Sequence, residues 1–230
     1  MDVNFLSKTL LFRGISEEDI ENMLHELGAK QQHFQKGEII FRAGDVVQSL
    51  GLVLSGSVNI ENDDVWGNKS ILDNIAPGQV FAETYACVPG EPMMVSVVAS
   101  EAAGVLFLNV GRGLEQEIGN PSEKRHYYGR LIQNLLIISA QKNLNLSRRI
   151  FHTTSKSIRG RLLSYLSYQA TRQGSFQFAI PFNRQQLADY LSVDRSAMSN
   201  ELSKMQKEGL LTVNRNYFIL NVEASDYGLI

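Results

Sequence analysis

Residues 183–207 constrain the fold of this chain most, because they predict two short helices around a tight turn. Asn183 precedes Gln186 by three residues, which is the spacing of a capping box at a helix start. Apolar residues follow at positions 187, 188 and 191, and residues 192–194 then break the pattern. Asp194 can cap a second helix, whose apolar residues at 198, 202 and 205 share one face.

The other face of the second predicted helix carries only small polar or cationic groups. They are Arg195, Ser196, Ser199 and Asn200. Arginine can bind the O6 and N7 atoms of guanine, and asparagine the N6 and N7 atoms of adenine, in the major groove of DNA. The positive ends of both helix dipoles also suit phosphate. The alternative is a solvated face on an ordinary helix pair.

The charge of the chain is unevenly distributed. Residues 148–218 carry eleven Lys and Arg against four Asp and Glu, whereas residues 1–147 carry eleven against eighteen. A basic segment that coincides with the helix pair favours phosphate binding, although an acidic partner protein would also explain it.

The composition excludes several classes of protein. The single cysteine, Cys87, excludes an internal disulfide and a cysteine-based cluster. The sequence shows no run of eighteen apolar residues, no secretory signal, no zinc spacing and no catalytic motif such as a P-loop or G-x-S-x-G. We therefore expect a cytoplasmic protein that is not an enzyme and has no cofactor, no metal site and no membrane partner.

The N-terminal half predicts β-structure. Ser16 and the acids after it predict the start of a helix that ends at Gly28. From residue 32 to 109, short apolar runs alternate with glycines, which is typical of a sandwich or barrel. We expect positive φ angles at the following glycines: Gly37, Gly44, Gly56, Gly78 and Gly90.

The pattern becomes helical after Pro121. Tyr128, Leu131, Leu135 and Ile138 form an apolar stripe, which predicts a dimerisation helix or a helix that only covers its own barrel. Residues 152–155 are the predicted hinge. A second helix is expected from about residue 154, with apolar positions at 158, 162, 163 and 166.

The C-terminal part predicts a wing. We expect a short strand over residues 176–180 and, after Gly209 ends the second helix of the pair, a β-hairpin with Arg215 at its tip. The predicted domains are a β-barrel sensor at 1–120, a dimerisation helix and hinge at 121–152, and a winged helix-turn-helix at 153–230.

These parts, in this order, resemble the cyclic-AMP receptor / fumarate-nitrate regulator (CRP/FNR) family of bacterial transcription factors. The resemblance covers nearly the whole chain and rests on FQKGEIIFRAGD, LVLSGSVNI, PGQVFAE and LADYLSVDRSAMSNEL. It implies an α+β fold: an N-terminal cyclic-nucleotide-binding-like β jelly-roll, a long dimerisation helix and a C-terminal winged helix-turn-helix. It also implies a homodimer on a near-palindromic site in double-stranded DNA, with a small-molecule effector and RNA polymerase as a further candidate partner.

The resemblance places the guanine-reading arginine of the family at Arg195. Family members often have Glu next and a second Arg four residues later, where this chain has Ser196 and Asn200, so we expect a different half-site. The candidate DNA-binding residues are Asn183, Arg184, Gln185, Asp194, Arg195, Ser196, Ser199, Asn200 and Arg215.

The resemblance also indicates which effector to expect. Members that bind cyclic nucleotides have a Gly-Glu pair and, ten residues later, an Arg that pairs with the phosphate; here the matching residues are Ala82-Glu83 and Met93-Met94. Without that arginine, a buried phosphate would be poorly compensated. We therefore expect an apolar or aromatic-acid effector, or none, and Glu83 could equally be a structural carboxylate. The candidate effector-binding residues are Phe81, Ala82, Glu83, Met93, Met94, Leu131 and Leu135.

A regulatory module that acts by protein contact is the competing interpretation. Binding to random duplex DNA that weakens steeply with salt would favour the transcription factor.

Overall fold

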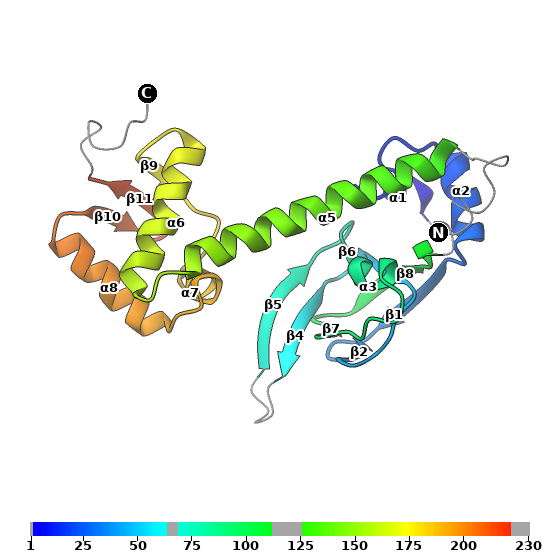
Figure 1. The fold of residues 1–230 in the computed structure, drawn as a ribbon, viewed down its shortest axis with the longest axis horizontal. Coiled ribbons are helices and arrows are strands. Elements are labelled where there is room, and N and C mark those ends of the chain that lie inside the picture. Colours follow the sequence, from blue (N-terminus) through cyan, green and yellow to red (C-terminus); the bar gives the residue numbers. More distant parts are fainter. Residues whose placement is uncertain (1, 64–68, 112–125, 222–230) are drawn as a thin grey trace. The chain divides into compact units, whose positions relative to one another are not determined.

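The computed structural model describes residues 2–63, 69–111 and 126–221 (Figure 1). The chain divides into two compact units, residues 1–141 and 142–230. The predicted domain boundary near residue 120 lies outside the described residues. No helix among the described residues has the length and apolar character needed to span a bilayer.

The first unit is a β-sandwich with two helices before it. Two four-stranded antiparallel sheets have the strand orders β1-β8-β3-β6 and β2-β7-β4-β5. The elements are α1 (Val3–Ser7), α2 (Glu17–Glu26), β1 (Lys30–Phe34), β2 (Ile39–Phe41), β3 (Leu50–Ser55), β4 (Val58–Asp63), β5 (Lys69–Ile75), β6 (Val80–Phe81), α3 (Glu83–Cys87), β7 (Ser96–Ala99) and β8 (Ala103–Leu108). The predicted jelly-roll is confirmed.

The turns of the sandwich confirm the glycine prediction. All five punctuating glycines have positive φ angles. Gly56, between β3 and β4, is the most constrained of them, because a Cβ there would collide with the carbonyl oxygen of Ala102. The predicted cap of α2 is also present, since the Ser16 hydroxyl accepts the Asp19 N–H.

Helix α5 (His126–Thr153) begins in the first unit. The predicted apolar stripe lies in the core of that unit together with residues of α1 and α2, so the stripe covers its own chain. Asn134 reinforces this packing, because its buried side-chain amide donates to the backbone carbonyls of Leu11 and Arg13 at 2.9 Å each. Leu136, which is adjacent to Leu135 but points away from this core, is 68% exposed.

The junction between the helices differs from the predicted hinge. His152 and Thr153 belong to α5, and α6 (Ile158–Gln173) begins only after Ser157 caps it, so residues 154–157 form the connection. Leu163, one of the predicted apolar positions of this helix, is 41% exposed, whereas Tyr165, two residues later, is buried. Leu163 is exposed because Leu162, Tyr165 and Leu166 occupy the face of α6 that packs on the core of the second unit.

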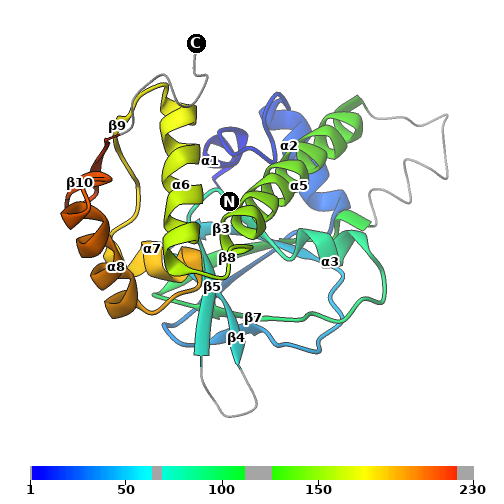
Figure 2. The ribbon, with the colours of Figure 1, turned by 60° about the vertical axis from the view of Figure 1, so that its left-hand side comes forward.

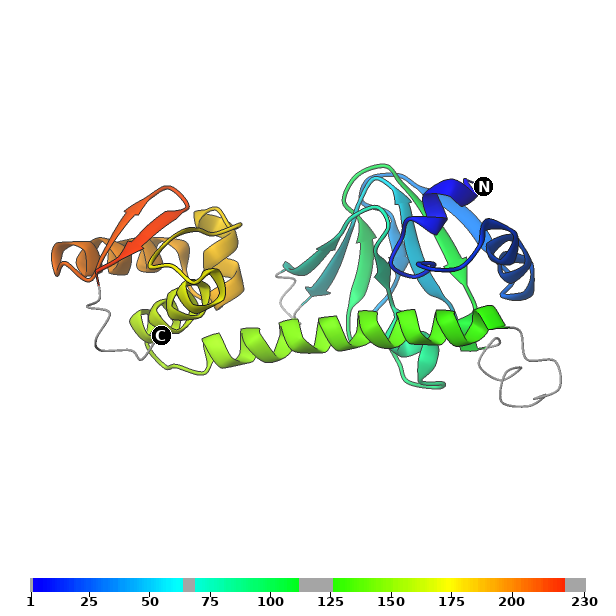
Figure 3. The same ribbon diagram turned by 90° about the horizontal axis from the view of Figure 1, so that it is seen from above.

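The second unit is a helix-turn-helix with a three-stranded sheet (Figures 2 and 3). It contains α6, β9 (Gln177–Ala179), α7 (Arg184–Leu191), α8 (Arg195–Lys207), β10 (Leu211–Asn214) and β11 (Tyr217–Leu220). The strand order is β10-β11-β9, with antiparallel pairing throughout. A separate hydrophobic core joins α6, α7, α8 and this sheet.

Candidate nucleic-acid interface

The two predicted helices are present as α7 and α8, and each begins at the predicted N-cap residue. The Asn183 side chain accepts the Gln186 N–H at 3.0 Å, and the Gln186 side chain accepts the Asn183 N–H at 2.9 Å. The Asp194 carboxylate accepts the Ala197 N–H at 2.7 Å at the start of α8. Ser192 adopts the left-handed conformation at φ 54°, which ends α7 and turns the chain into α8.

Two arginines from outside the helix pair hold the turn between α7 and α8. Arg161 of α6 donates to the carbonyls of Leu191 and Ser192 at 2.9 Å each and to that of Ser155 at 2.8 Å. Arg149 of α5 donates to the carbonyls of Asp189 and Tyr190. The carbonyls of residues 189–192 lie in the last turn and C-cap of α7, so the two guanidinium groups place positive charge at the negative end of this helix.

The back of α8 is anchored by apolar and ionic contacts. Met198, Leu202 and Met205 are at most 2% exposed and belong to the core of the second unit, as predicted. Arg159 of α6 bonds to Glu201 at 2.6 Å and to both carboxylate oxygens of Glu208. The hydrogen bond from Arg159 lowers the pKa of Glu208. The contacts described so far therefore hold α8 through the face that packs on the core of the second unit.

The opposite face of α8 is open. Arg195, Ser196 and Asn200 are exposed, and Ser199 is half-buried. Among the residues that the structure describes, no side-chain hydrogen bond or ion pair engages these four side chains. A guanidinium, two hydroxyls and a carboxamide therefore remain available for an external partner.

The predicted wing is the hairpin of β10 and β11 (Figure 3). Arg215 is exposed in its two-residue turn with φ 55°, and the neighbouring Asn216 fixes the turn by donating to the Ile180 carbonyl at 3.0 Å. The guanidinium at this tip has the exposure that a phosphate contact needs.

Two other predicted contact residues already have partners within the second unit. The guanidinium of Arg184 lies 5.5 Å from the centre of the Phe218 ring, and burial lowers its pKa. The exposed Gln185 donates to the Asp189 carboxylate at 2.8 Å. Their contact with DNA stays a prediction.

The predicted effector residues are dispersed. Phe81 and Met93 are buried in the interior of the sandwich, whereas Met94 is 76% exposed. Leu131 and Leu135 lie on α5 and are buried in the core of the first unit.

Ala82, at φ 58°, is the N-cap of α3, and Glu83 in the first turn is 4% exposed. The structure does not bring these seven residues together around one cavity that it describes, so their role stays a prediction.

The sequence reasoning missed a cavity of about 340 Å³ in the sandwich, lined in part by Lys30, Gln32 and Phe34 of β1. Residues 30–34 show no alternation of polar and apolar side chains, so no local signal indicates this cavity. Among the described residues, no group of three or more His, Cys, Asp or Glu side chains could hold a metal ion.

Comparison with known proteins defines the class. The model of the cyclic nucleotide-binding domain matches residues 31–114, and that of the Crp-like helix-turn-helix domain matches residues 160–224. The chain is 25% identical over 208 residues to the cyclic AMP receptor protein of Thermus thermophilus, covering 87% of each. It is 23% identical over 204 residues to electron transport regulator A of Shewanella oneidensis, covering 86% of this chain and 78% of that protein.

A solved structure supports the fold. CprK complexed with OCPA aligns with a TM-score of 0.63 at 13% identity, covering 89% of this chain and 92% of that one. A cyclic-nucleotide-type sensor domain joined to a Crp-like helix-turn-helix defines a transcription regulator, not an enzyme. The chain belongs to the CRP/FNR family, as its motifs predicted.

Proposed function

We propose that two copies of this chain bind a near-palindromic site in double-stranded DNA through α8, under the control of a small effector other than cyclic AMP. The open polar face of α8 carries the proposal. Three of its side chains are exposed, and the helix behind them is held by Met198, Leu202 and Met205. A recognition helix needs one face that is packed against its own domain and an opposite face whose polar side chains are free to contact DNA.

The chemistry of the face suits the major groove. Arg195 in the first turn of α8 can donate two parallel hydrogen bonds to guanine, and Asn200 can pair with adenine or contact a phosphate. The turn of the wing adds the exposed cation of Arg215. Phosphate contacts set the position of the protein on the duplex, and the contacts of α8 to base edges set its specificity.

A dimer is supported by exposed apolar residues of α5. Ile137, Leu144 and Phe151 recur every seven residues within this helix and are 39%, 54% and 69% exposed. Seven-residue spacing is the seam of a coiled coil. In such a dimer the two recognition helices would contact half-sites about one helical turn, roughly 34 Å, apart. The stripe that first suggested dimerisation is buried within the chain and cannot serve as this seam.

The residues at 93 and 94 argue against cyclic AMP. Met93 is 3% exposed inside the sandwich and Met94 points to solvent, so neither supplies a cation for a phosphate. An effector acts by binding one state of the protein more tightly than another. We expect no heat of binding when cyclic AMP is titrated into the full chain in a calorimeter; tight binding would refute this part of the proposal.

DNA binding is tested by fluorescence anisotropy with random duplexes over a range of salt concentrations. The logarithm of the affinity should fall linearly with the logarithm of salt, because Lys and Arg displace condensed counterions. Binding that is absent or insensitive to salt would instead favour the module that acts by protein contact.

The role of Arg195 is tested on a duplex carrying the preferred site. Arg195→Ala should weaken binding by about 1–3 kcal/mol. Arg172→Ala is the matched control, because Arg172 is an exposed arginine in the last turn of α6. Equal losses in the two variants would contradict the assignment.

A further inference from the structure

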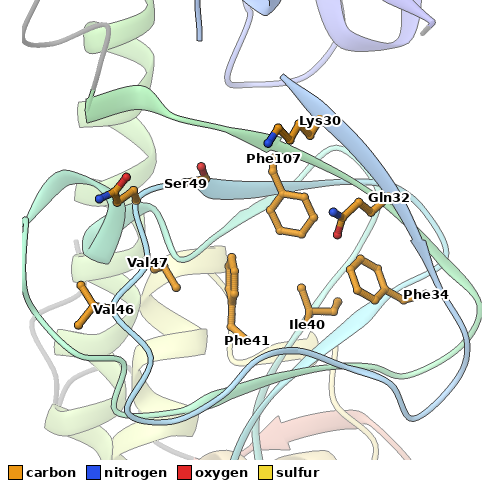
Figure 4. A pocket seen from close by; sticks show the side chains of 10 residues that line it. Lys30, Gln32, Phe34, Ile40, Phe41, Val46, Val47, Ser49 and Phe107 are labelled. Atoms are coloured by element: carbon orange, nitrogen blue, oxygen red, sulfur yellow. The ribbon is translucent and has the colours of Figure 1, made fainter. Parts of the chain in front are cut away.

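One end of the sandwich contains a cavity of about 340 Å³ (Figure 4). This volume lies within the range of small-molecule sites, roughly 300–1,000 Å³. Its wall is mostly apolar, made by Phe34, Ile40, Phe41, Val47 and Phe107. The Phe107 ring meets those of Phe34 and Phe41 edge to face, at centroid distances of 6.2 and 5.6 Å. The wall therefore presents ring edges and faces to whatever occupies the cavity.

The register of β1 directs two polar side chains to the same side as this wall. Lys30 pairs with Phe107, and Gln32 pairs with Val105 on β8. Paired residues of antiparallel strands point to the same face, and Val105 is fully buried in the interior of the sandwich. Lys30 and Gln32, which are both exposed to solvent, consequently border the cavity on the side of its apolar wall, as Figure 4 shows.

These polar groups have no partner among the described residues. Within residues 2–63, 69–111 and 126–221, no hydrogen bond or ion pair engages the side chains of Lys30, Gln32 or Ser49. Ser49 also borders the cavity. An ammonium, a carboxamide and a hydroxyl beside an apolar, largely aromatic wall are the few orienting polar groups typical of a ligand site.

We infer that this cavity binds a small carboxylate with an aromatic or aliphatic body. The single Lys30 cation matches one carboxylate, Gln32 and Ser49 can donate to its second oxygen, and the rings of Phe34, Phe41 and Phe107 bury the apolar body. None of the residues that the family resemblance suggested for the effector lines this cavity.

The cavity is also connected to the start of α3. Phe41 lies 5.6 Å from Phe107 and 6.0 Å from Phe81, centroid to centroid. Phe81 directly precedes Ala82, the left-handed N-cap of α3. A ligand that displaces Phe41 would therefore press on Phe81. That the ligand is an effector rests on the proposed regulatory function, whereas its binding does not.

Calorimetry on the full chain without DNA tests the site, with 3-phenylpropanoate and octanoate as probes and 3-phenylpropanamide as the uncharged comparison. Both carboxylates should bind. Lys30→Met should weaken them about tenfold or more, because it removes a hydrogen bond between charged groups, and should leave binding of the amide unchanged. Lys36→Met is the matched control, since Lys36 is an exposed lysine outside the cavity.

Two results would overturn the inference: no binding of either carboxylate at millimolar concentration, or equal affinity in the wild type and Lys30→Met. DNA binding is measured separately on the same samples. A protein that binds duplex DNA but neither probe retains the proposed function and loses this site. A protein that binds the probes but no DNA retains the site and loses the proposed function.

Discussion

Replacing Arg161 with methionine should loosen the turn that sets the start of α8. One guanidinium makes three hydrogen bonds to backbone carbonyls, and two of them, to Ser155 and Leu191, are partly buried. Water can replace the third, because the bond to Ser192 is exposed. Of the two partly buried bonds only the one to Leu191 reaches the turn, so its loss of about 1 kcal/mol corresponds to roughly fivefold in the local opening equilibrium of the turn.

Hydrogen exchange of the full chain, read by mass spectrometry, measures this opening directly. Peptides that cover residues 187–197 should exchange roughly fivefold faster in Arg161→Met than in the wild type. Arg172→Met controls for the loss of an arginine from the same helix, and amides of the β-sandwich serve as an internal reference. Unchanged exchange around the turn would show that Arg161 does not hold it.

Three further predictions concern other parts of the chain. Burial lowers the pKa of His152, so the free energy of unfolding should fall as the pH drops below about 6.5, the ordinary pKa of histidine. This pH dependence should be absent in His152→Phe. Thermal melting with the same pH profile in the wild type and the variant would contradict it. Leu144→Glu should give monomers in sedimentation analysis, whereas Leu146→Glu, 62% exposed but off the seven-residue seam, should not; a dimeric Leu144→Glu would exclude the seam. Gly209→Ala should destabilise the second unit by roughly 1–2 kcal/mol in thermal unfolding, because φ is +78° there, and an equal melting temperature would refute this.

The environment of His152 explains the sign of its pH dependence. The ring is 1% exposed, and its Nε2 lacks a hydrogen-bond partner among the described residues. The rings of Tyr165, Tyr168 and Tyr190 lie 5.1–6.1 Å away, with Ser164 at 3.1 Å from Nδ1.

Burial of the imidazole among these rings disfavours its protonated form. Arg148 and Arg149 lie over two of the tyrosine rings. Acid therefore protonates the unfolded chain before the folded one, and stability that is complete above the ordinary histidine pKa is lost below it.

Local signals in the sequence predicted local structure well. The capping box at Asn183, the cap at Asp194 and the glycine turns each depend on residues a few positions apart, and the structure contains all of them. The helix-turn-helix, with its buried and open faces, followed from the same short-range spacing.

Long-range contacts could not be predicted in this way. The bond from Arg161 to the Leu191 carbonyl spans thirty residues, and nothing in the sequence near either residue indicates it. Periodicity also could not tell which neighbour the stripe on α5 would cover, because an intramolecular core and a dimer seam produce the same pattern. The cavity was missed because strand pairing alone places Lys30 beside Phe107.

Selection of bound duplexes from a random library, followed by sequencing, tests the recognition face of α8 most directly. The wild type should recover paired half-sites about one helical turn apart with a fixed G·C pair in each, and Arg195→Ala should recover the same spacing with that position relaxed. Sites recovered with identical preference by both proteins would contradict reading of DNA by this helix.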